Sequence, residues 1–212
     1  MVSLATQYPL YSPPDLMTED AFNATTQKIK DALPQGVVGV GCGVGLAVWM
    51  ENIYIPLTEK IVKAFDLSIN PLDLPDPFSS LGLGSKILLA PFICILGPIM
   101  EEMMFRGTCQ EVLKDTFNSF YVNLGFPDSA AQMAARVTSV FFSSVIFGLI
   151  HFTNAIMFWC NPILFLPQVV FATIVGLILG LAKEISGELY MPIGMHIGNN
   201  TLAWGMSILY NQ

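Results

Sequence analysis

The chain has 212 residues, of which 53% are hydrophobic and only 12% are charged, and its net charge at pH 7 is −7. Its mean hydropathy is +0.60. An ordinary soluble domain carries about 25% charged residues, so a soluble enzyme is disfavoured, and the high apolar content excludes a disordered chain. The acidic balance leaves no basic stripe for a nucleic acid. We therefore expect an integral membrane protein, with the lipid bilayer around it and no nucleic-acid partner.

The amino-terminal region, residues 1–35, is mostly polar and precedes the first apolar run. A helix-start signal within it predicts an amphipathic helix that runs to Leu33 and is closed by Pro34. Because the first apolar run begins so late, we expect no cleavable signal peptide, and the first span itself directs insertion. The chain is thus divided into a polar arm with an amphipathic helix, residues 1–35, and a transmembrane helical domain, residues 36–212.

The first membrane span is expected over 36–57, and its sequence opens with closely spaced glycines. Gly39 and Gly43 stand four residues apart, as do Gly41 and Gly45, so either pair gives a helix face that a second helix can approach closely. A nucleotide-binding loop is disfavoured, because no strand precedes these glycines and no Gly-Lys-Thr follows them. We predict that they serve helix packing.

Further apolar segments bring the expected total to at least five membrane helices. None of the residues between Arg136 and Lys183 is charged, and that stretch is long enough for two spans of about 20 residues each. After the first span, the expected spans are 86–105, 132–151, 154–183 and 189–210, with a loop at 58–85 and an amphipathic interfacial helix at 108–125. The predicted fold is an all-α, polytopic transmembrane bundle of about five to seven helices.

Small residues and prolines refine the fourth span. Gly176 and Gly180 repeat the four-residue packing spacing. Pro162 and Pro167 mark a bend or a re-entrant break ahead of them. The four cysteines, at positions 42, 94, 109 and 160, form no CxxC pair, so we expect packing residues and neither a disulfide framework nor a zinc knuckle.

Polar residues inside the apolar segments fall into three clusters. A charged group at membrane depth costs roughly 2.5 to 3.5 kcal/mol, so each one needs a reason. The first cluster is Glu101, Glu102 and Arg106, the second is His151, and the third is His196 with Asn199 and Asn200. The chain contains only two histidines, and both lie in these clusters. The clusters are therefore the candidate site.

Helical spacing sorts the members of the first and third clusters. Glu102 and Arg106 are four residues apart with the acid first, which is the favourable order for an ion pair. Glu101 points about 100° away, so it is not committed to the arginine. His196 and Asn200 are also four apart and share a face. One carboxylate is thus expected to be held while the other is free to do chemistry.

A carboxylate, two histidines and an amide that converge inside a bundle favour water-dependent acyl chemistry. The free carboxylate or one histidine takes a proton from water, while the other histidine and the asparagine amide donate hydrogen bonds to a developing oxyanion. Glu101, His151 and His196 are alternatively a zinc set with an open fourth position for water. The cofactor prediction is therefore either none or a divalent metal such as zinc.

At these clusters the chain resembles the CAAX protease and bacteriocin-processing family, also called the Abi family, of intramembrane endopeptidases. The family carries EExxxR, FxxxH and HxxxN or HxxxD, in that order, on successive membrane helices. This chain has EEMMFR, FGLIH and HIGNN, and the Gly-Pro-Ile before the glutamates and the glycine after the arginine also match. The resemblance covers about residues 87–205. It leaves the first 80 residues without a counterpart.

The resemblance implies a role for each matching residue. Glu101 would activate water, with His151 helping to hold or deprotonate it, and Glu102 would support the site. His196 and Asn200 would form the pair that stabilises the oxyanion. Arg106, Phe147 and Asn199 would be supporting residues, with Arg106 paired to Glu102 and Phe147 shaping the pocket. Whether such enzymes need a metal has been argued both ways within the family.

The resemblance implies an endopeptidase, a metalloprotease if the metal is required, that cleaves a peptide or a membrane-anchored protein. Eukaryotic members cleave prenylated CAAX tails, whereas prokaryotic relatives are linked to peptide maturation or bacteriocin self-immunity. The compact size favours a multi-pass protein of a prokaryotic inner membrane. Sequence signatures of other intramembrane proteases, HExxH and GxGD among them, are absent.

Two other readings stay open. One is a non-catalytic member of the family, an immunity or peptide-binding membrane protein that keeps the fold. The other is a proton-coupled transporter, because buried Glu and His relays also serve pumps. A transporter predicts repeated halves with paired broken helices, and the sequence shows no such repeat, so this reading ranks last.

Overall fold

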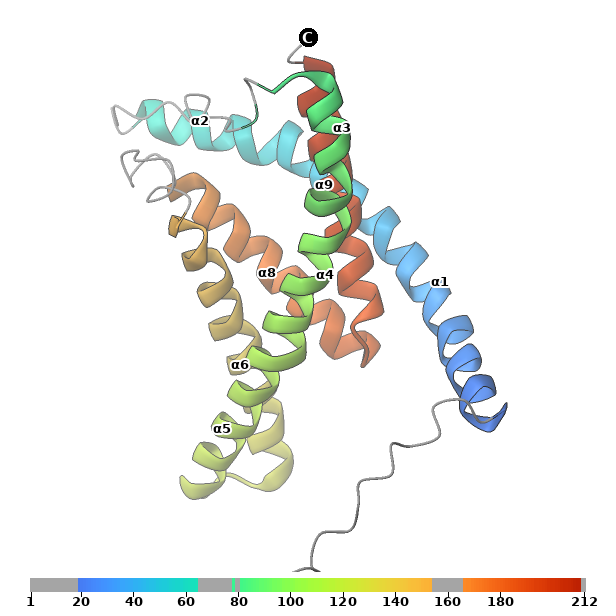
Figure 1. The fold of residues 1–212 in the computed structure, drawn as a ribbon. Helices are drawn as coiled ribbons and strands as arrows, with labels where there is room; N and C mark the ends of the chain where they lie inside the picture. Colours follow the sequence, from blue (N-terminus) through green and yellow to red (C-terminus); the bar gives the residue numbers. More distant parts are fainter. Residues whose placement is uncertain (1–18, 65–77, 79–80, 154–165, 211–212) are drawn as a thin grey trace, which may run out of the picture. The chain divides into compact units, whose positions relative to one another are not determined.

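The computed structural model describes residues 19–64, 78, 81–153 and 166–210, and within these ranges it contains helices and no strand. The all-α prediction is therefore confirmed. In chain order the helices are α1 (Glu19–Trp49), α2 (Ile55–Ala64), α3 (Leu83–Pro91), α4 (Gly97–Glu102), α5 (Gln110–Asn123), α6 (Asp128–Ile150), α8 (Leu166–Ser186) and α9 (Tyr190–Tyr210), with π-helical turns η1 (Met50–Tyr54), η3 (Phe92–Leu96) and η4 (Met103–Cys109) (Figure 1).

The chain divides by its internal contacts into Met1–Pro34 and Gln35–Gln212, and each unit is described by itself. In the first unit the prediction that Pro34 closes a helix is wrong, because α1 continues through that proline to Trp49. A proline removes one backbone hydrogen bond, but the apolar residues that follow Pro34 satisfy their remaining backbone groups best within a helix. The predicted division into residues 1–35 and residues 36–212 stays a prediction.

In the second unit two predicted breaks are wrong. The expected loop at 58–85 begins later, since η1 and α2 carry the first helical run on to Ala64. The interfacial helix expected at 108–125 is not separate, since helix runs from Leu83 to Asn123 through two π-helical turns. A π-helical turn adds a residue without ending the helix, so a local change of period does not mark a boundary.

The later spans lie close to their predicted positions. The third span forms as α6, the fourth as α8 and the last as α9. Pro167 lies in the first turn of α8, where a missing N–H costs no hydrogen bond, and Pro162 lies outside the described residues. Gly176 and Gly180 pack as predicted, because a Cβ on either would lie 3.0 to 3.1 Å from α6 atoms of Ser144 or Val140.

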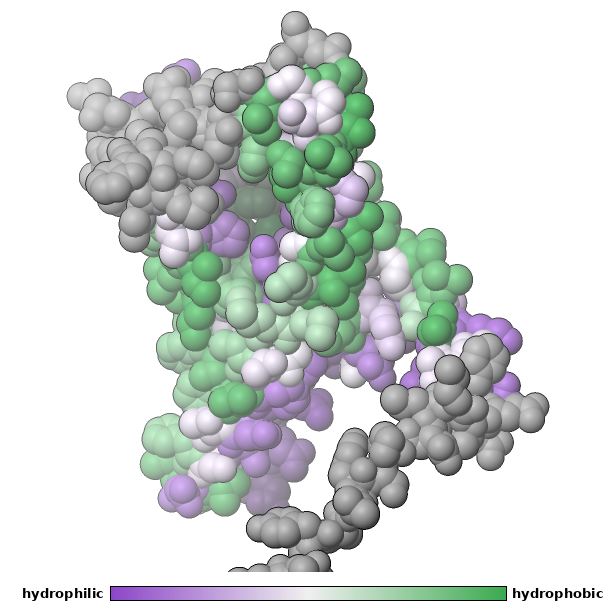
Figure 2. All heavy atoms as spheres, in the orientation of Figure 1, coloured by the Kyte–Doolittle hydropathy of each residue, from purple (hydrophilic) through white to green (hydrophobic). Residues whose placement is uncertain are grey.

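Within the described residues, four helical runs are long and apolar enough to cross a membrane: Asn23–Ile61, Leu83–Asn123, Asp128–Ile150 and Leu166–Ser186. Helix α9 is not among them, although it has 21 residues, because His196, Asn199 and Asn200 lower its hydropathy. Apolar side chains cover the visible outer face of α3 and α4, and hydrophilic ones gather toward the end of α5 (Figure 2). These features identify a membrane protein.

Candidate active site

The two glutamates of the first cluster lie on α4, a short segment between two π-helical turns. Pro91 immediately precedes η3, and Pro98 lies in the first turn of α4, so two missing N–H donors flank the widened turn. Helix α9 packs along both α4 and η3. The irregular backbone thus presents Glu101 and Glu102 to the helix that carries the third cluster, which is typical of π-bulges at functional sites.

Glu102 is the centre of the site. Its side chain is fully buried, and its Oε1 accepts hydrogen bonds from Arg106 Nη1 at 3.0 Å and from His196 Nδ1 at 2.8 Å. The ion pair with Arg106 is the one that the four-residue spacing predicts. Glu102 Oε2 is buried and has no hydrogen-bond partner among the described residues. Glu102 is therefore held by two donors and is not open to a substrate.

Arg106 is itself almost fully buried and is anchored on three sides. Its Nη2 donates to the Gly176 carbonyl of α8 at 3.1 Å. Its guanidinium carbon lies 4.5 Å from the centroid of the Phe147 ring, within the range of a cation–π interaction. Together with Glu102, these partners replace part of the water that the guanidinium loses on burial. Its Nε is buried and has no hydrogen-bond partner among the described residues.

His196 joins the two carboxylates. Its Nδ1 lies against Glu102, and its Nε2 lies 3.8 Å from Glu101 Oε2. Because a carboxylate in an ion pair only accepts hydrogen bonds, Nδ1 carries the proton on the Glu102 side. The sequence placed His196 with Asn200 and gave no sign of this bridge, since 94 residues separate His196 from Glu102.

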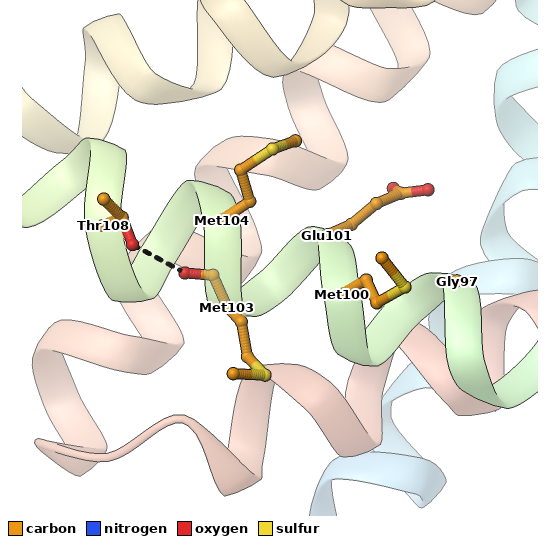
Figure 3. Close-up of a pocket in the computed structure, with 6 residues that line it drawn as sticks. All are labelled: Gly97, Met100, Glu101, Met103, Met104 and Thr108. Atoms are coloured by element: carbon orange, nitrogen blue, oxygen red, sulfur yellow. Dashed lines mark hydrogen bonds between the residues drawn. The ribbon is translucent and has the colours of Figure 1, made fainter.

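Glu101 differs from its neighbour in exposure. Its side chain is 39% exposed, against none for Glu102. It lines a pocket of about 660 Å³ with Gly97, Met100, Met103, Met104 and Thr108. Figure 3 shows Glu101 and Met104 projecting from one side of the helix and Met103 from the other. The methionines were missed by the sequence reasoning, because an apolar side chain inside a membrane span carries no signal that separates a pocket from a lipid contact.

His151 and Phe147 reach the site through aromatic contacts. His151 Nδ1 lies 2.8 Å from the Phe147 carbonyl oxygen, so Nδ1 bears the proton and Nε2 is left as the acceptor when the ring is neutral. The Phe147 ring lies 5.0 Å from the His151 ring and 5.9 Å from the His196 ring, edge to face in both cases. In the part of the chain that the structure describes, His151 and Glu101 share no hydrogen bond. That the two residues hold a water molecule together stays a prediction.

The two asparagines form a short chain along α9. Asn199 Nδ2 donates to Asn200 Oδ1 at 3.2 Å, and Asn200 Nδ2 donates to the Ile93 carbonyl in η3, also at 3.2 Å. Asn200 thus faces the same α3–α4 run as His196, as their spacing predicts, but at a different turn. Asn199 Oδ1 is buried and has no partner among the described residues.

The alternative zinc set does not fit this geometry. Within residues 19–64, 78, 81–153 and 166–210, no group of three His, Cys, Asp or Glu side chains is arranged so that it could hold a metal ion. His196 has one ring nitrogen on Glu102 and turns the other toward Glu101. Glu101, His151 and His196 are therefore not gathered into a ligand set.

Fold and site together define an all-α membrane protein with a buried carboxylate–imidazole cluster between its helices. Residues 83–202, more than half of the chain, match the family model of Rce1-like type II CAAX prenyl endopeptidases. The chain belongs to this family, and the resemblance inferred from the three motifs is confirmed. Comparison with curated proteins and with solved structures finds no match.

Proposed function

We propose that this chain is an intramembrane endopeptidase that hydrolyses a peptide bond in a membrane-associated or lipidated, CAAX-like peptide or protein. One observation carries the proposal. His196 is fixed by the buried Glu102 and turns its other ring nitrogen toward Glu101, the one glutamate of the pair that reaches a pocket. Membership in the endopeptidase family supports the same reaction class.

Glu101 is the proposed general base. Its carboxylate takes a proton from a water molecule, and the water oxygen forms a bond to the carbonyl carbon of the substrate. Glu102 is unsuited to this role, because its Oε1 is occupied by two donors and its side chain has no exposed surface. His151 Nε2, which its Nδ1 contact leaves as an acceptor, is a second group that can orient the water.

His196 and Asn200 are the proposed oxyanion donors. When both of its ring nitrogens carry protons, His196 donates from Nδ1 to Glu102 and presents an Nε2–H on the side of Glu101. There it can stabilise the negative charge on the former carbonyl oxygen. Asn200 Nδ2 has a second hydrogen besides the one on Ile93. Glu101 then returns its proton to the amine nitrogen as the carbon–nitrogen bond breaks.

A cleavage assay on purified protein in detergent tests the proposal. Quenched peptides are offered with and without a lipidated cysteine near the carboxy terminus, and the His196→Ala variant is run beside the natural chain. We expect cleavage by the natural chain, a fall in kcat of roughly 10²- to 10³-fold in the variant, and no effect of a chelator. Circular dichroism verifies that the variant stays helical.

Equal cleavage by the natural chain and by a helical His196→Ala variant would overturn the proposal. A well-folded natural chain that binds peptides of the panel and cleaves none would favour the non-catalytic, peptide-binding reading instead. The chelator arm bears on the metal alone. Loss of cleavage there would show that a ligand set forms that the described geometry lacks.

A further inference from the structure

The first helix lies outside the matched residues 83–202, yet its part from Gln35 onward packs tightly against α9. We infer that this part of α1 is a positioning element of the site, which sets the distance between His196 and the two glutamates. The inference rests on the proposed function for its catalytic consequence only. The structural consequence, the placement of the His196 ring, is measurable without it.

The approach of the two helices leaves no room for side chains. A Cβ on Gly43 would overlap the Met195 carbonyl and lie 2.8 Å from the Asn199 nitrogen. A Cβ on Gly39 would lie 3.0 Å from the Met195 nitrogen and would overlap the Met191 carbonyl. All of these atoms belong to the α9 backbone, so no rotamer change can relieve the overlap.

The glycines of α9 likewise have no room for a side chain where they face α1. A Cβ on Gly194 would overlap the Gly36 carbonyl, and a Cβ on Gly198 would overlap the Val40 carbonyl and lie 3.0 Å from the Val40 Cα. Glycines thus face backbone on both helices. The two helices therefore touch backbone to backbone at these glycines, and not through ordinary side-chain packing.

The contact between α1 and α9 lies on both sides of His196 in the sequence. Met195 and Asn199, whose backbone atoms meet Gly43, lie on either side of it in the sequence. His196 itself points the other way, toward α4, where its Nδ1 is 2.8 Å from Glu102. A hydrogen bond of this kind is lost beyond about 3.2 to 3.5 Å. Any substitution that moves α9 off α1 therefore changes the contact between His196 and Glu102.

One helix supplies both the test position and its matched control. Gly41 and Gly45 lie two residues on either side of Gly43, and a Cβ on either of them meets no atom of the described residues within 4 Å. Gly→Ala changes the helix propensity equally at each of these positions. Of these changes, only the one at Gly43 places an atom against the α9 backbone. The difference between Gly43→Ala and Gly41→Ala therefore measures the effect of the contact between α1 and α9.

Imidazole ¹⁵N NMR on histidine-labelled protein reads the outcome directly, since the chain has only two histidines, His151 and His196. We expect Gly43→Ala to shift the ring signals of His196 and leave those of His151 in place, while Gly41→Ala changes neither. In the cleavage assay we expect kcat to fall roughly 10²-fold in Gly43→Ala with KM unchanged, the cost of a misplaced group.

If Gly43→Ala does not fold, Leu46→Ala takes its place. Leu46 and Met195 belong to one buried cluster, and shortening Leu46 loosens the same contact without adding an atom. Unchanged His196 signals in a folded variant at Gly43, or in Leu46→Ala where that variant replaces it, overturn the inference, as does an equal response to Gly41→Ala. If the natural chain cleaves nothing, the proposed function fails by itself, and the ring signals still decide the positioning role.

Discussion

Glu101→Gln is expected to lower the cleavage rate by roughly 10²- to 10⁴-fold and to leave the fold intact. Glutamine keeps the size of the side chain but cannot take a proton from water, so the contribution of the general base is lost. The fold tolerates the change because Glu101 is 39% exposed and its contact with the His196 Nε2 is long, at 3.8 Å. Single-turnover cleavage kinetics measure the rate, and thermal unfolding measures the fold.

Glu111→Gln is the matched control for this prediction. Glu111 lies on the same helical run as Glu101, has nearly the same side-chain exposure of 38%, and forms ion pairs with Lys114 and Lys183 away from the two histidines. Its replacement should leave the cleavage rate unchanged. A natural cleavage rate in Glu101→Gln, or an equal loss in Glu111→Gln, would contradict the assignment of Glu101 as the base.

Arg106→Met is expected to destabilise the protein by roughly 3 to 5 kcal/mol, the cost of leaving a buried charge without its partner. Methionine retains the apolar volume of the side chain but removes the donor to Glu102 Oε1 and the donor to the Gly176 carbonyl. Among the described residues, Glu102 then keeps His196 alone as a hydrogen-bond donor. Equilibrium unfolding in mixed detergent micelles measures the change in the free energy of unfolding.

Two companion variants define what this result means. Arg136→Met removes a 56% exposed arginine that lies 3.9 Å from Glu184, and a pair of that kind contributes about 0 to 1 kcal/mol. The double variant with Arg106→Met and Glu102→Gln removes both buried charges, so it should be less destabilised than Arg106→Met alone. A loss in Arg106→Met no greater than in Arg136→Met would show that the buried pair does not stabilise the site.

The same residues show which contacts of the site could be predicted from spacing along one helix. The pair of Glu102 and Arg106 could be predicted because both partners lie one turn apart on one helix, where spacing alone fixes their distance. The shared face of His196 and Asn200 could be predicted for the same reason. The bond from His196 to Glu102 could not, since nothing local relates residues 94 positions apart.

The predicted helix boundaries are wrong where a local sequence signal lies inside an apolar segment. Pro34 predicts the end of a helix, and the change from an apolar to an amphipathic sequence near residue 108 predicts the start of a new one. The helix nevertheless continues through both places. Proline and π-helical turns disturb the backbone over one turn only. In an apolar segment the neighbouring peptide groups still have to bond within the helix, so the helix outlasts the disturbance.

The glycines of the first span divide the two kinds of information most clearly. The sequence by itself determined that this is an all-α membrane protein and that polar groups cluster on a few helices. It also predicted that Gly39 with Gly43, like Gly41 with Gly45, would give a face for a close helix contact, because composition and helical period are local properties. Only the tertiary structure showed that the two pairs differ: Gly39 and Gly43 lie against the α9 backbone, whereas a Cβ on Gly41 or Gly45 meets no atom of the described residues within 4 Å. It likewise decided that Glu102 is held and that Glu101 reaches the pocket. Burial and partner choice depend on which helix packs on which face, and that is set by contacts between segments far apart in the chain.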